Sequence, residues 1–424
     1  MDGLILGFDL CDNYSQISCF QPKELDAEPV YVTNEEQYLI PTVICRKKET
    51  GEWCVGEEAF KLTLLGEGVL VDKLVKLVEK NGSETIEGIK YSADSLLEKF
   101  LRKTLEIAQK RYCITAIKSL VFCLQSLDTK LMDAITLCMD HLKIPRDRVH
   151  IISRSESYIY YVLSQKREVW NHLIAMFDLS DTGLHYYEMI VHKGIRPQTV
   201  EVFHEELEEG FSLEILESAS GGKIADRILC ACGERLMNKK VFSSVLLTGK
   251  GFETKEWAVN FMKAAGNKRK LFFAPNTFAM GAAYKAYAYT SDSRIYPYIA
   301  ICEGTLPVTV SLKVQVDGKD RQLLLVSAGD NWYEARSTAE LLLDQVNAID
   351  FDITPVGKRQ GNKISIPLAG FPERPNKTTK VELLTAFTGE DVMTIRIKDQ
   401  GFGELFPATD TLIQEEIHIG SAAQ

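Results

Sequence analysis

The stretch Leu173-Ile-Ala-Met-Phe-Asp-Leu-Ser-Asp-Thr-Gly-Leu-His-Tyr-Tyr-Glu-Met189 has the pattern of a β-hairpin. An apolar strand leads into a polar turn over Asp178 to Gly183, and a second strand follows. A similar segment opens the chain: Phe8-Asp9-Leu10-Cys11-Asp12 matches Phe177-Asp178-Leu179-Ser180-Asp181. The repetition predicts two similar half-domains that face each other, with the first Asp of each hairpin pointing between them. An ordinary turn, in which Asp is common, is the alternative for each hairpin.

Length and composition describe a soluble globular protein with more than one core. A chain of 424 residues suggests two or three domains. An apolar fraction of 45% and a charged fraction of 25% are typical of soluble proteins. The net charge of −10 argues against a nucleic-acid surface.

The expected location is the cytoplasm. No apolar run reaches the length of a membrane span, so we expect no membrane association. The first residues, Met1-Asp-Gly, lack the basic start of a secretory signal. The ten cysteines are scattered, mostly within apolar segments, and this favours reduced thiols.

Two kinds of periodicity divide the chain. Over residues 1–290, strands alternate with amphipathic helices, which predicts a parallel sheet covered by helices. The repeated hairpins divide this part into halves at about 1–168 and 169–290. A long helical stretch is expected over 212–237, interrupted at Gly221-Gly222. Beyond residue 294 the period becomes two, and residues 298–412 are expected to form an antiparallel β-sandwich.

The order of these parts resembles a known family. Residues 1–290 resemble the actin-like ATPase fold, with ribonuclease H-like duplicated halves, and specifically the nucleotide-binding domain of the DnaK-type (seventy-kilodalton heat-shock) chaperones. Residues 298–412 look like that family's β-sandwich substrate-binding domain. Within it, Ile366-Pro-Leu-Ala-Gly-Phe-Pro-Glu-Arg-Pro375 and the later strand Met393-Thr-Ile-Arg-Ile-Lys-Asp399 are similar to the family's Leu-x-Gly-Ile-Pro-Pro-Ala-Pro and final strand.

The resemblance implies a site for ATP or ADP with Mg²⁺. It places phosphate loops at residues 7–15 and 178–183, a glycine turn for adenosine at 248–251, and a second connecting helix near 279–283. The implied nucleotide contacts are Asp9, Cys11, Asp12, Asn13, Ser180, Asp181, Thr182, Gly183, Gly249, Lys250, Gly251 and Gly281. The implied catalytic residues are Lys73, Glu156 and Asp178, and the implied metal ligands are Asp9 and Asp178.

The residues themselves suit phosphoryl transfer, which needs Mg²⁺, phosphate-binding amides and a group that positions water. Asp9 and Asp178 are suited to hold a hydrated Mg²⁺. Glu156 is suited to position water, and Lys73 to neutralise the transferred group. Each residue also has a structural alternative. Lys73 could be a solvated lysine on a helix, and Glu156 an acid favoured by the N-terminus of a helix. Gly249 and Gly251 could form a plain strand-to-helix connection.

The phosphate loops depart from the family pattern. Cys11-Asp12-Asn13 stands where the family has Gly-Thr-Thr, and Ser180-Asp181-Thr182-Gly183 where it has Gly-Gly-Gly-Thr. Glycines that allow close backbone approach to phosphate are mostly missing. Asp12 and Asp181 add charges that repel a triphosphate by roughly 4 kcal/mol each at about 4 Å and an effective dielectric near 20, unless an extra cation or outward-turned side chains relieve them.

Three functions remain open at this point. The favoured hypothesis is a pseudo-ATPase, a scaffold or protein-binding relative with weak or no hydrolysis, which binds a polypeptide through the sandwich. The second is an ATP-dependent chaperone, in which ATP hydrolysis controls peptide binding. The third is an actin-like filament former, which the sandwich disfavours. Fold resemblance alone does not decide between them.

Overall fold

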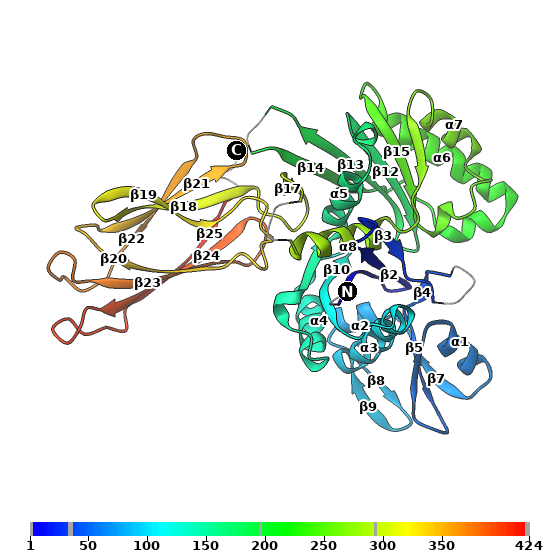
Figure 1. Cartoon of the computed structure of the whole chain (residues 1–424), viewed down its shortest axis with the longest axis horizontal. Helices are drawn as coiled ribbons and strands as arrows, with labels where there is room; N and C mark the ends of the chain where they lie inside the picture. Colours follow the sequence, from blue (N-terminus) through cyan, green and yellow to red (C-terminus); the bar gives the residue numbers. More distant parts are fainter. Residues whose placement is uncertain (1–2, 33–36, 195–196, 292–294, 420–424) are drawn as a thin grey trace. The chain divides into compact units, whose positions relative to one another are not determined.

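The chain forms two compact units, of which one is mixed α/β and the other is built from antiparallel strands (Figure 1). The computed structural model describes residues 3–32, 37–194, 197–291 and 295–419. Unit 1 comprises residues 1–191 and 202–297, and unit 2 comprises residues 192–201 and 298–424. The mixed and then antiparallel order of the sequence prediction is therefore present. Residues 292–294, in the expected junction, lie outside the described residues.

The first sheet of unit 1 has the strand order β11-β10-β1-β2-β3, with β4 paired to β2. Strand β1 runs antiparallel to β2 and parallel to β10, which in turn runs parallel to β11. The strands are β1 (Leu4–Leu10), β2 (Tyr14–Gln21), β3 (Asp26–Pro29), β4 (Ile40–Pro41), β10 (Ile117–Leu124) and β11 (Val149–Ser153).

The second sheet repeats this topology in the order β16-β15-β12-β13-β14. Strand β12 runs antiparallel to β13 and parallel to β15, which runs parallel to β16. The strands are β12 (Leu173–Ser180), β13 (Gly183–His192), β14 (Thr199–Glu206), β15 (Phe242–Thr248) and β16 (Lys270–Phe273). Both predicted hairpins are present. The polar turn begins later than expected: Asp178 still lies within β12, and the turn comprises Asp181 and Thr182.

Helices pack against the sheets of unit 1. They are α1 (Gly56–Leu64), α2 (Leu74–Glu79), α3 (Ala93–Tyr112), α4 (Thr129–His141), α5 (Arg154–Ser164), α6 (Ala219–Met237), α7 (Val259–Ala265) and α8 (Thr277–Tyr289). The helical stretch expected over 212–237 is interrupted, but at Ser218, between a 3-10 helix (Leu213–Glu217) and α6, and not at Gly221-Gly222. Both glycines lie in the first turn of α6, where the Ser218 side chain caps the helix by accepting a hydrogen bond from Gly221 N.

Helices α5 and α8 follow the last strand of each half, so they occupy equivalent positions, and they pack against each other. Gly281 lies at their crossing: a Cβ atom there would lie 2.0 Å from the Ser157 carbonyl oxygen. The glycine is therefore required by helix packing, which is a different reason from the expected contact with nucleotide.

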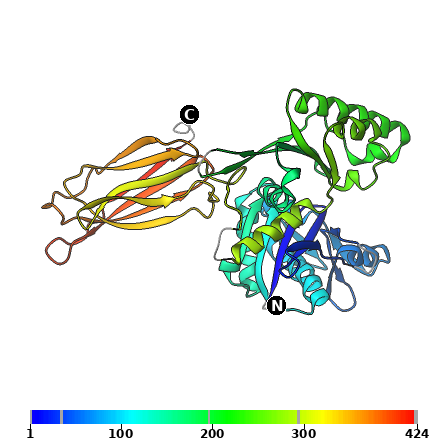
Figure 2. The same cartoon turned by 45° about the horizontal axis from the view of Figure 1, so that its top comes forward.

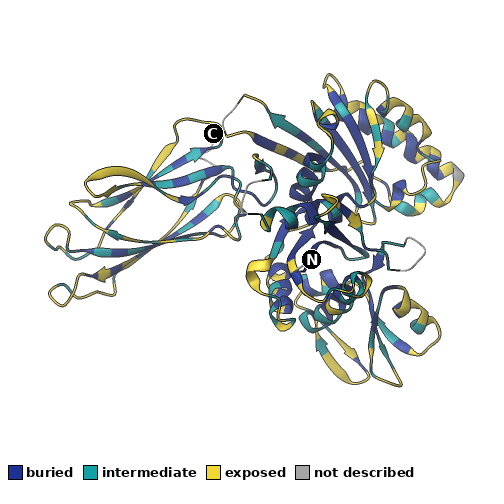
Figure 3. Cartoon of the chain, in the orientation of Figure 1, coloured by how far each residue is buried: buried dark blue, intermediate teal, exposed yellow. Residues whose placement is uncertain are grey.

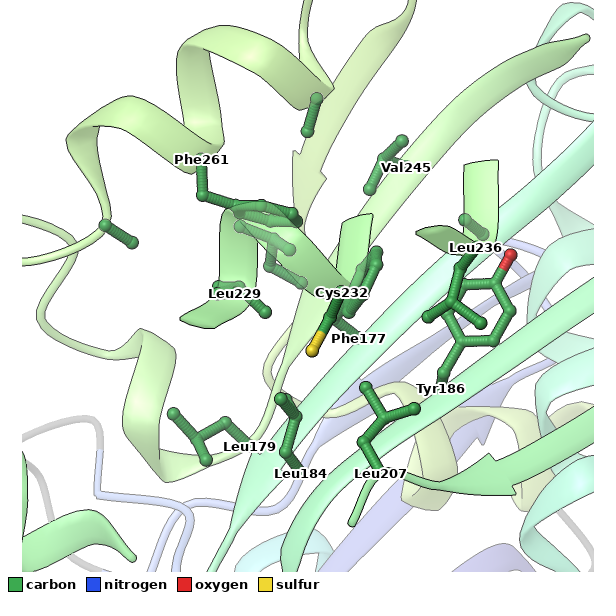
Figure 4. Close-up of a cluster of buried hydrophobic side chains, with 14 of the residues drawn as sticks. Phe177, Leu179, Leu184, Tyr186, Leu207, Leu229, Cys232, Leu236, Val245 and Phe261 are labelled. Atoms are coloured by element: carbon green, nitrogen blue, oxygen red, sulfur yellow. The ribbon is translucent and has the colours of Figure 1, made fainter. Parts of the chain in front are cut away.

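The alternation of strand β12 determines where Asp178 points. Phe177 and Leu179 pack into a buried cluster with Leu229 of α6 and Phe261 of α7 (Figure 4). Asp178 lies between them in the sequence, so its side chain projects from the opposite face of the sheet. Buried residues follow the strands of both sheets, while exposed residues gather on outer helices and loops (Figure 3).

Unit 2 contains two four-stranded antiparallel sheets, in the orders β19-β18-β21-β22 and β20-β23-β24-β25. Buried side chains of both sheets form one core, which includes Phe351 and Ile395. The strands run along the length of the unit (Figure 2). They are β18 (Val308–Val316), β19 (Lys319–Val326), β20 (Ser337–Leu342), β21 (Ala348–Pro355), β22 (Asn362–Pro367), β23 (Lys380–Phe387), β24 (Val392–Gly401) and β25 (Leu412–His418). A short strand, β17 (Ile299–Ile301), pairs with residues 199–201 of β14.

Candidate functional site

The two repeated aspartates lie at equivalent places in unit 1. Asp9 is the penultimate residue of β1, and Asp178 lies near the end of β12. Asp9 is 3% exposed and Asp178 is 1% exposed. Because a buried carboxylate is costly without a partner, each needs a cation or hydrogen-bond donors.

Arg154 is the cation that lies between them. Its Nη2 and Nε atoms lie 3.2 and 3.4 Å from the two carboxylate oxygens of Asp9. Its Nη1 atom lies 3.3 Å from Oδ2 of Asp178. The guanidinium also lies over the Phe278 ring, 4.5 Å from the ring centroid. One buried arginine thus joins the equivalent strands of the two halves.

Burial and the neighbouring charges shift the pKa values of Arg154, Asp178 and Cys11. Burial lowers the pKa of Arg154, but Asp9, Cys11 and Asp178 outweigh burial and hold that pKa well above its usual range. Burial raises the pKa of Asp178 to about 6, and the nearby Arg154 limits the rise. With this pKa, most Asp178 carboxyl groups are ionised at pH 7. Burial also raises the pKa of the Cys11 thiol, so its sulfur is protonated and accepts a hydrogen bond from Arg154 Nη2 at 2.8 Å.

The additional acids of the two loops have their own cations. The Asp12 carboxylate lies 3.8 Å from Lys73 Nζ and 3.7 Å from Lys76 Nζ. It also accepts a hydrogen bond from the Lys76 backbone. At the second loop, the Lys250 Nζ bonds the Tyr14 hydroxyl at 3.1 Å, and the charge of Asp181 contributes to a raised pKa of Lys250. The repulsion expected at Asp12 is therefore relieved by lysines of the chain itself.

Lys73 lies close to the first loop, but its contacts differ from the expected catalytic role. Besides Asp12, its Nζ bonds the Asn13 side chain. Lys73 has a left-handed backbone (φ 52°) and immediately precedes α2. It neutralises a carboxylate of the chain, whereas its expected role was to neutralise a transferred phosphoryl group.

The cavity between the loops is small. Its volume is about 60 Å³, whereas pockets for small molecules and cofactors usually measure about 300–1,000 Å³. The predicted site residues that line it are Asp9, Cys11, Asp12, Asn13, Asp178, Ser180, Asp181, Thr182, Gly249 and Lys250. Arg154 and Phe278 also line it and reduce the space between the aspartates.

The glycines of the predicted adenosine turn serve packing. A Cβ atom at Gly249 would lie 2.4 Å from Asp178 Oδ1, and one at Gly251 would lie 2.4 Å from the Leu179 side chain. Gly249 also has φ +88°, which favours glycine. Gly183 begins β13 with φ +117° and does not line the cavity. Gly249 and Gly251 require glycine because the chain itself comes close, and Gly183 is favoured by its backbone angle, so these positions give no sign of a nucleotide.

The structure does not fit the role predicted for Glu156. Glu156 is 1% exposed, does not line the cavity, and pairs with Lys285 of α8 at 3.0 Å. Residues two apart on a helix point roughly 200° away from each other. When Arg154 faces the aspartates, Glu156 therefore faces elsewhere, and it helps to join α5 to α8.

Sequence reasoning missed Arg154, although a signal was present. Arg154 follows the apolar strand Ile151-Ile152 after one serine, and that serine caps α5 by accepting a hydrogen bond from Glu156 N. A charged residue at a buried strand-to-helix junction is unusual unless it is paired. Within the described ranges, no group of three or more His, Cys, Asp or Glu side chains is arranged to hold a metal ion.

Two histidines extend the polar cluster behind the second loop. His185 is the cross-strand partner of Asp178 and is 2% exposed. Its Nε2 atom lies 3.2 Å from Thr182 Oγ1, and its Nδ1 atom lies 3.2 Å from His204 Nε2. Burial lowers the pKa of each histidine to about 4, so both are neutral at pH 7.

Comparison with known families places this architecture among domains without an assigned function. The family of unknown function DUF5716, C-terminal, matches residues 27–303, and the domain of unknown function DUF8552 matches residues 305–419. The first match covers more than half of the chain, and the chain belongs to the DUF5716 family. No curated protein matches it. In the described part of the chain, no helix has the length and apolar character needed to cross a membrane.

Proposed function

We propose that the chain is a divergent DnaK-like pseudo-ATPase that acts as a scaffold or protein-binding module. In this proposal, unit 1 is an actin-like domain with two ribonuclease H-like halves, and unit 2 is a β-sandwich that binds a polypeptide or partner protein. The repeated strand topology of the two sheets supports the first assignment. The common core of two antiparallel sheets supports the second. The DnaK-like assignment rests on the order of the parts and on the sequence resemblance.

The observation that carries the pseudo-ATPase assignment is Arg154 between Asp9 and Asp178. An ATPase with these two carboxylates needs a divalent cation there, to shield the phosphates. Arg154 already supplies the positive charge. A guanidinium donates hydrogen bonds but has no coordination positions for phosphate oxygens or water, so it does not replace the coordination that Mg²⁺ provides.

The mutation that tests this arrangement is Arg154→Ala. The wild-type protein should give no heat of binding with Mg-ATP or Mg-ADP in calorimetry, and no steady hydrolysis. Removing the arginine leaves two buried carboxylates unpaired, which should cost about 3–5 kcal/mol of unfolding free energy. Mg²⁺ or Mn²⁺ should recover part of this loss, because a cation that binds only the folded state stabilises it.

Arg146→Ala is the matched control. Arg146 is a surface residue with a side chain 73% exposed, and it pairs with Asp140. Its removal should change stability by less than about 1 kcal/mol and create no response to metal ions. If Arg154→Ala does not fold, the double variant Asp9→Asn with Asp178→Asn removes the charges that Arg154 neutralises, and it should also fail to bind nucleotide. Micromolar Mg-ATP binding by the wild type would reject the proposal.

The alternative function, an ATP-dependent chaperone, makes a different prediction for unit 2. If nucleotide controls peptide binding, Mg-ATP should change the affinity of the full chain for a fluorescent unfolded peptide. Under the pseudo-ATPase proposal, the anisotropy titration is the same with and without nucleotide. A shift of tenfold or more, which corresponds to about 1.4 kcal/mol, would favour the chaperone.

A further inference from the structure

Two cysteines form a cross-strand pair in the small sheet of unit 1, away from the site described above. This sheet has the order β6-β5-β7, with β5 (Ile44–Lys47), β6 (Trp53–Val55) and β7 (Gly68–Val71). Cys45 of β5 is directly opposite Cys54 of β6 in the antiparallel register. The Cys54 thiol donates a hydrogen bond to the Cys45 carbonyl oxygen at 3.4 Å.

The spacing of opposite residues suits a disulfide. Directly opposite residues in antiparallel strands have Cα atoms about 4.5–5.5 Å apart. Disulfides are found at Cα separations of about 4.4–6.8 Å. The Cys45 sulfur fills the space over Gly68, where an added Cβ atom would lie 2.2 Å from it. Closing the bond requires the Cys45 side chain to rotate about χ1 towards Cys54, while the backbone register stays the same.

The pair is buried, but one member borders a groove. Cys45 is 0% and Cys54 5% exposed, and both belong to a small core with Val43 and Ala59. Cys54 lines a groove of about 910 Å³ that runs between this sheet and helix α3. A small oxidant can therefore approach Cys54 first, and Cys45 is available as the second thiol.

We propose that Cys45 and Cys54 are a redox-sensitive dithiol that closes to a disulfide on exposure to a hydroperoxide. In the first step, the Cys54 thiolate attacks the peroxide oxygen, the O–O bond breaks, and Cys54 becomes a sulfenic acid as the leaving group is released as an alcohol or water. In the second step, the Cys45 sulfur attacks the sulfenic sulfur, the S–O bond breaks, and water leaves. The peroxide gains the two electrons that the two thiols lose.

The rate of this reaction depends on pH in a specific direction. Burial raises the pKa of Cys54 to about 11, and the nearby Cys45 thiol adds to the rise. Because the thiolate is the reacting form, the rate should increase about tenfold per pH unit between pH 7 and 9. At neutral pH the two cysteines therefore react slowly with peroxide, so the disulfide forms under sustained oxidation.

The test is mass spectrometry of the full-length protein after treatment with hydrogen peroxide. Free thiols are alkylated and the protein is digested with trypsin, which can cleave at Arg46, Lys47 and Lys48 between the two cysteines. We expect a linked pair of peptides containing Cys45 and Cys54, and its loss after reduction. The hairpin amides should also exchange with deuterium more slowly in the oxidised protein.

Two variants separate the steps. Cys45→Ser should leave Cys54 as a sulfenic acid that a 1,3-diketone reagent traps, whereas Cys54→Ser should yield no oxidised Cys45. Cys113→Ser is the control, because Cys113 is exposed and outside this sheet, and this variant should form the disulfide normally. The proposal fails if peroxide oxidises Cys113 of the wild type while Cys45 and Cys54 both remain open to alkylation after denaturation.

Discussion

At the scale of single residues, buried charges decide the behaviour of both units. In unit 2, Asp399 is 0% exposed and accepts hydrogen bonds from both terminal nitrogens of Arg374, at 2.7 and 2.8 Å. It also accepts from the Gly401 and Thr409 backbones. Every lone pair of this carboxylate is therefore directed at a donor, and the loop between β24 and β25 is held by it.

Asp399→Asn should destabilise unit 2 by about 3–5 kcal/mol, because it leaves Arg374 buried without its counter-charge. Burial opposes ionisation of Asp399, but the hydrogen bonds from Arg374 and Thr409 outweigh it and hold the pKa far below its usual range. Its contribution is therefore complete above about pH 4, the unfolded pKa, and is lost as the pH falls towards the folded pKa. Urea unfolding at pH 7 and pH 3 measures both effects.

The comparison variant for Asp399 is Glu340→Gln. Glu340 pairs with Lys380 on the surface, with a side chain 64% exposed. A change below about 1 kcal/mol is expected there. Equal losses in the two variants would mean that burial does not determine the contribution of the Arg374 pair.

The two buried histidines give a second prediction at this scale. Their pKa values are lowered because burial disfavours the charged form, whereas that of Asp399 is lowered because its partners stabilise the charged form. The folded pKa of His185 is about 4, below the unfolded value of about 6.5. Between these values the unfolded chain binds more protons, so stability should fall as the pH falls from 6.5 to 4. The loss for His185 is up to about 3 kcal/mol at 1.36 kcal/mol per pKa unit. Asp178, with its raised pKa, opposes this loss below pH 6.

Unfolding free energies at pH 7.5 and 5 in wild type, His185→Gln and His172→Gln isolate the histidine contribution. His172 is exposed, so its variant should keep the wild-type pH dependence. His185→Gln should flatten the curve. An unchanged slope in that variant would show that the buried imidazole does not titrate between the two pH values.

At the scale of elements, helix α5 makes two separate sets of contacts. One turn directs Arg154 to the aspartates, and the next residues join α8 through Glu156 and Lys285. Glu156 is buried and the Lys285 side chain is 14% exposed, and the Tyr160 hydroxyl accepts a hydrogen bond from Lys285 at 2.9 Å. The position of Arg154 therefore depends on how closely α5 packs against α8.

Gly281→Ala tests that packing. The added methyl would lie 2.0 Å from the Ser157 oxygen, so α8 has to move away from α5. Overpacking of this kind costs about 1–3 kcal/mol. Gly389→Ala is the control, because its Cβ atom would contact only Asp391 Oδ1, at 3.8 Å. Thermal melts of both variants should show a lower Tm for Gly281→Ala alone.

The sequence was a good guide to elements and a poor guide to side-chain pairing. The Phe-Asp-Leu repeat predicted both hairpins, since a period of two and a polar turn depend only on neighbouring residues. The partner of Asp9 is far away in sequence, at Arg154, and no local pattern specifies such a contact. Gly281 and Glu156 were assigned to a ligand because the resemblance supplied roles for them, whereas their structural contacts are with the chain itself.

At the scale of the whole molecule, the two units are interleaved in sequence. Residues 192–201 belong to unit 2, although they lie between segments of unit 1. Strand β17 pairs with residues 199–201 of β14, and the DUF5716 match extends to residue 303, beyond this strand. A boundary drawn at residue 290, as the sequence suggested, separates β14 from that partner strand.

A chain ending at residue 303 should therefore be more stable than one ending at 290. The shorter chain lacks β17, so residues 199–201 of β14 lose the hydrogen bonds to that strand. Thermal melts of the two truncations at equal concentration measure the difference. A monomeric 1–290 chain with the same melting temperature as 1–303 would show that β17 contributes nothing to this edge.

Because Arg154 is part of the chain, the positive charge between Asp9 and Asp178 does not depend on a diffusible ligand. The occupancy of a site by an ion or nucleotide depends on the free concentration of that ligand, but a side chain of the same molecule is present at all times. Under the proposed function, the charge between Asp9 and Asp178 does not vary with magnesium, with the ratio of ATP to ADP, or with a chelator. The protein would then not change conformation with nucleotide or magnesium levels, which suits a scaffold and does not suit a nucleotide-controlled switch.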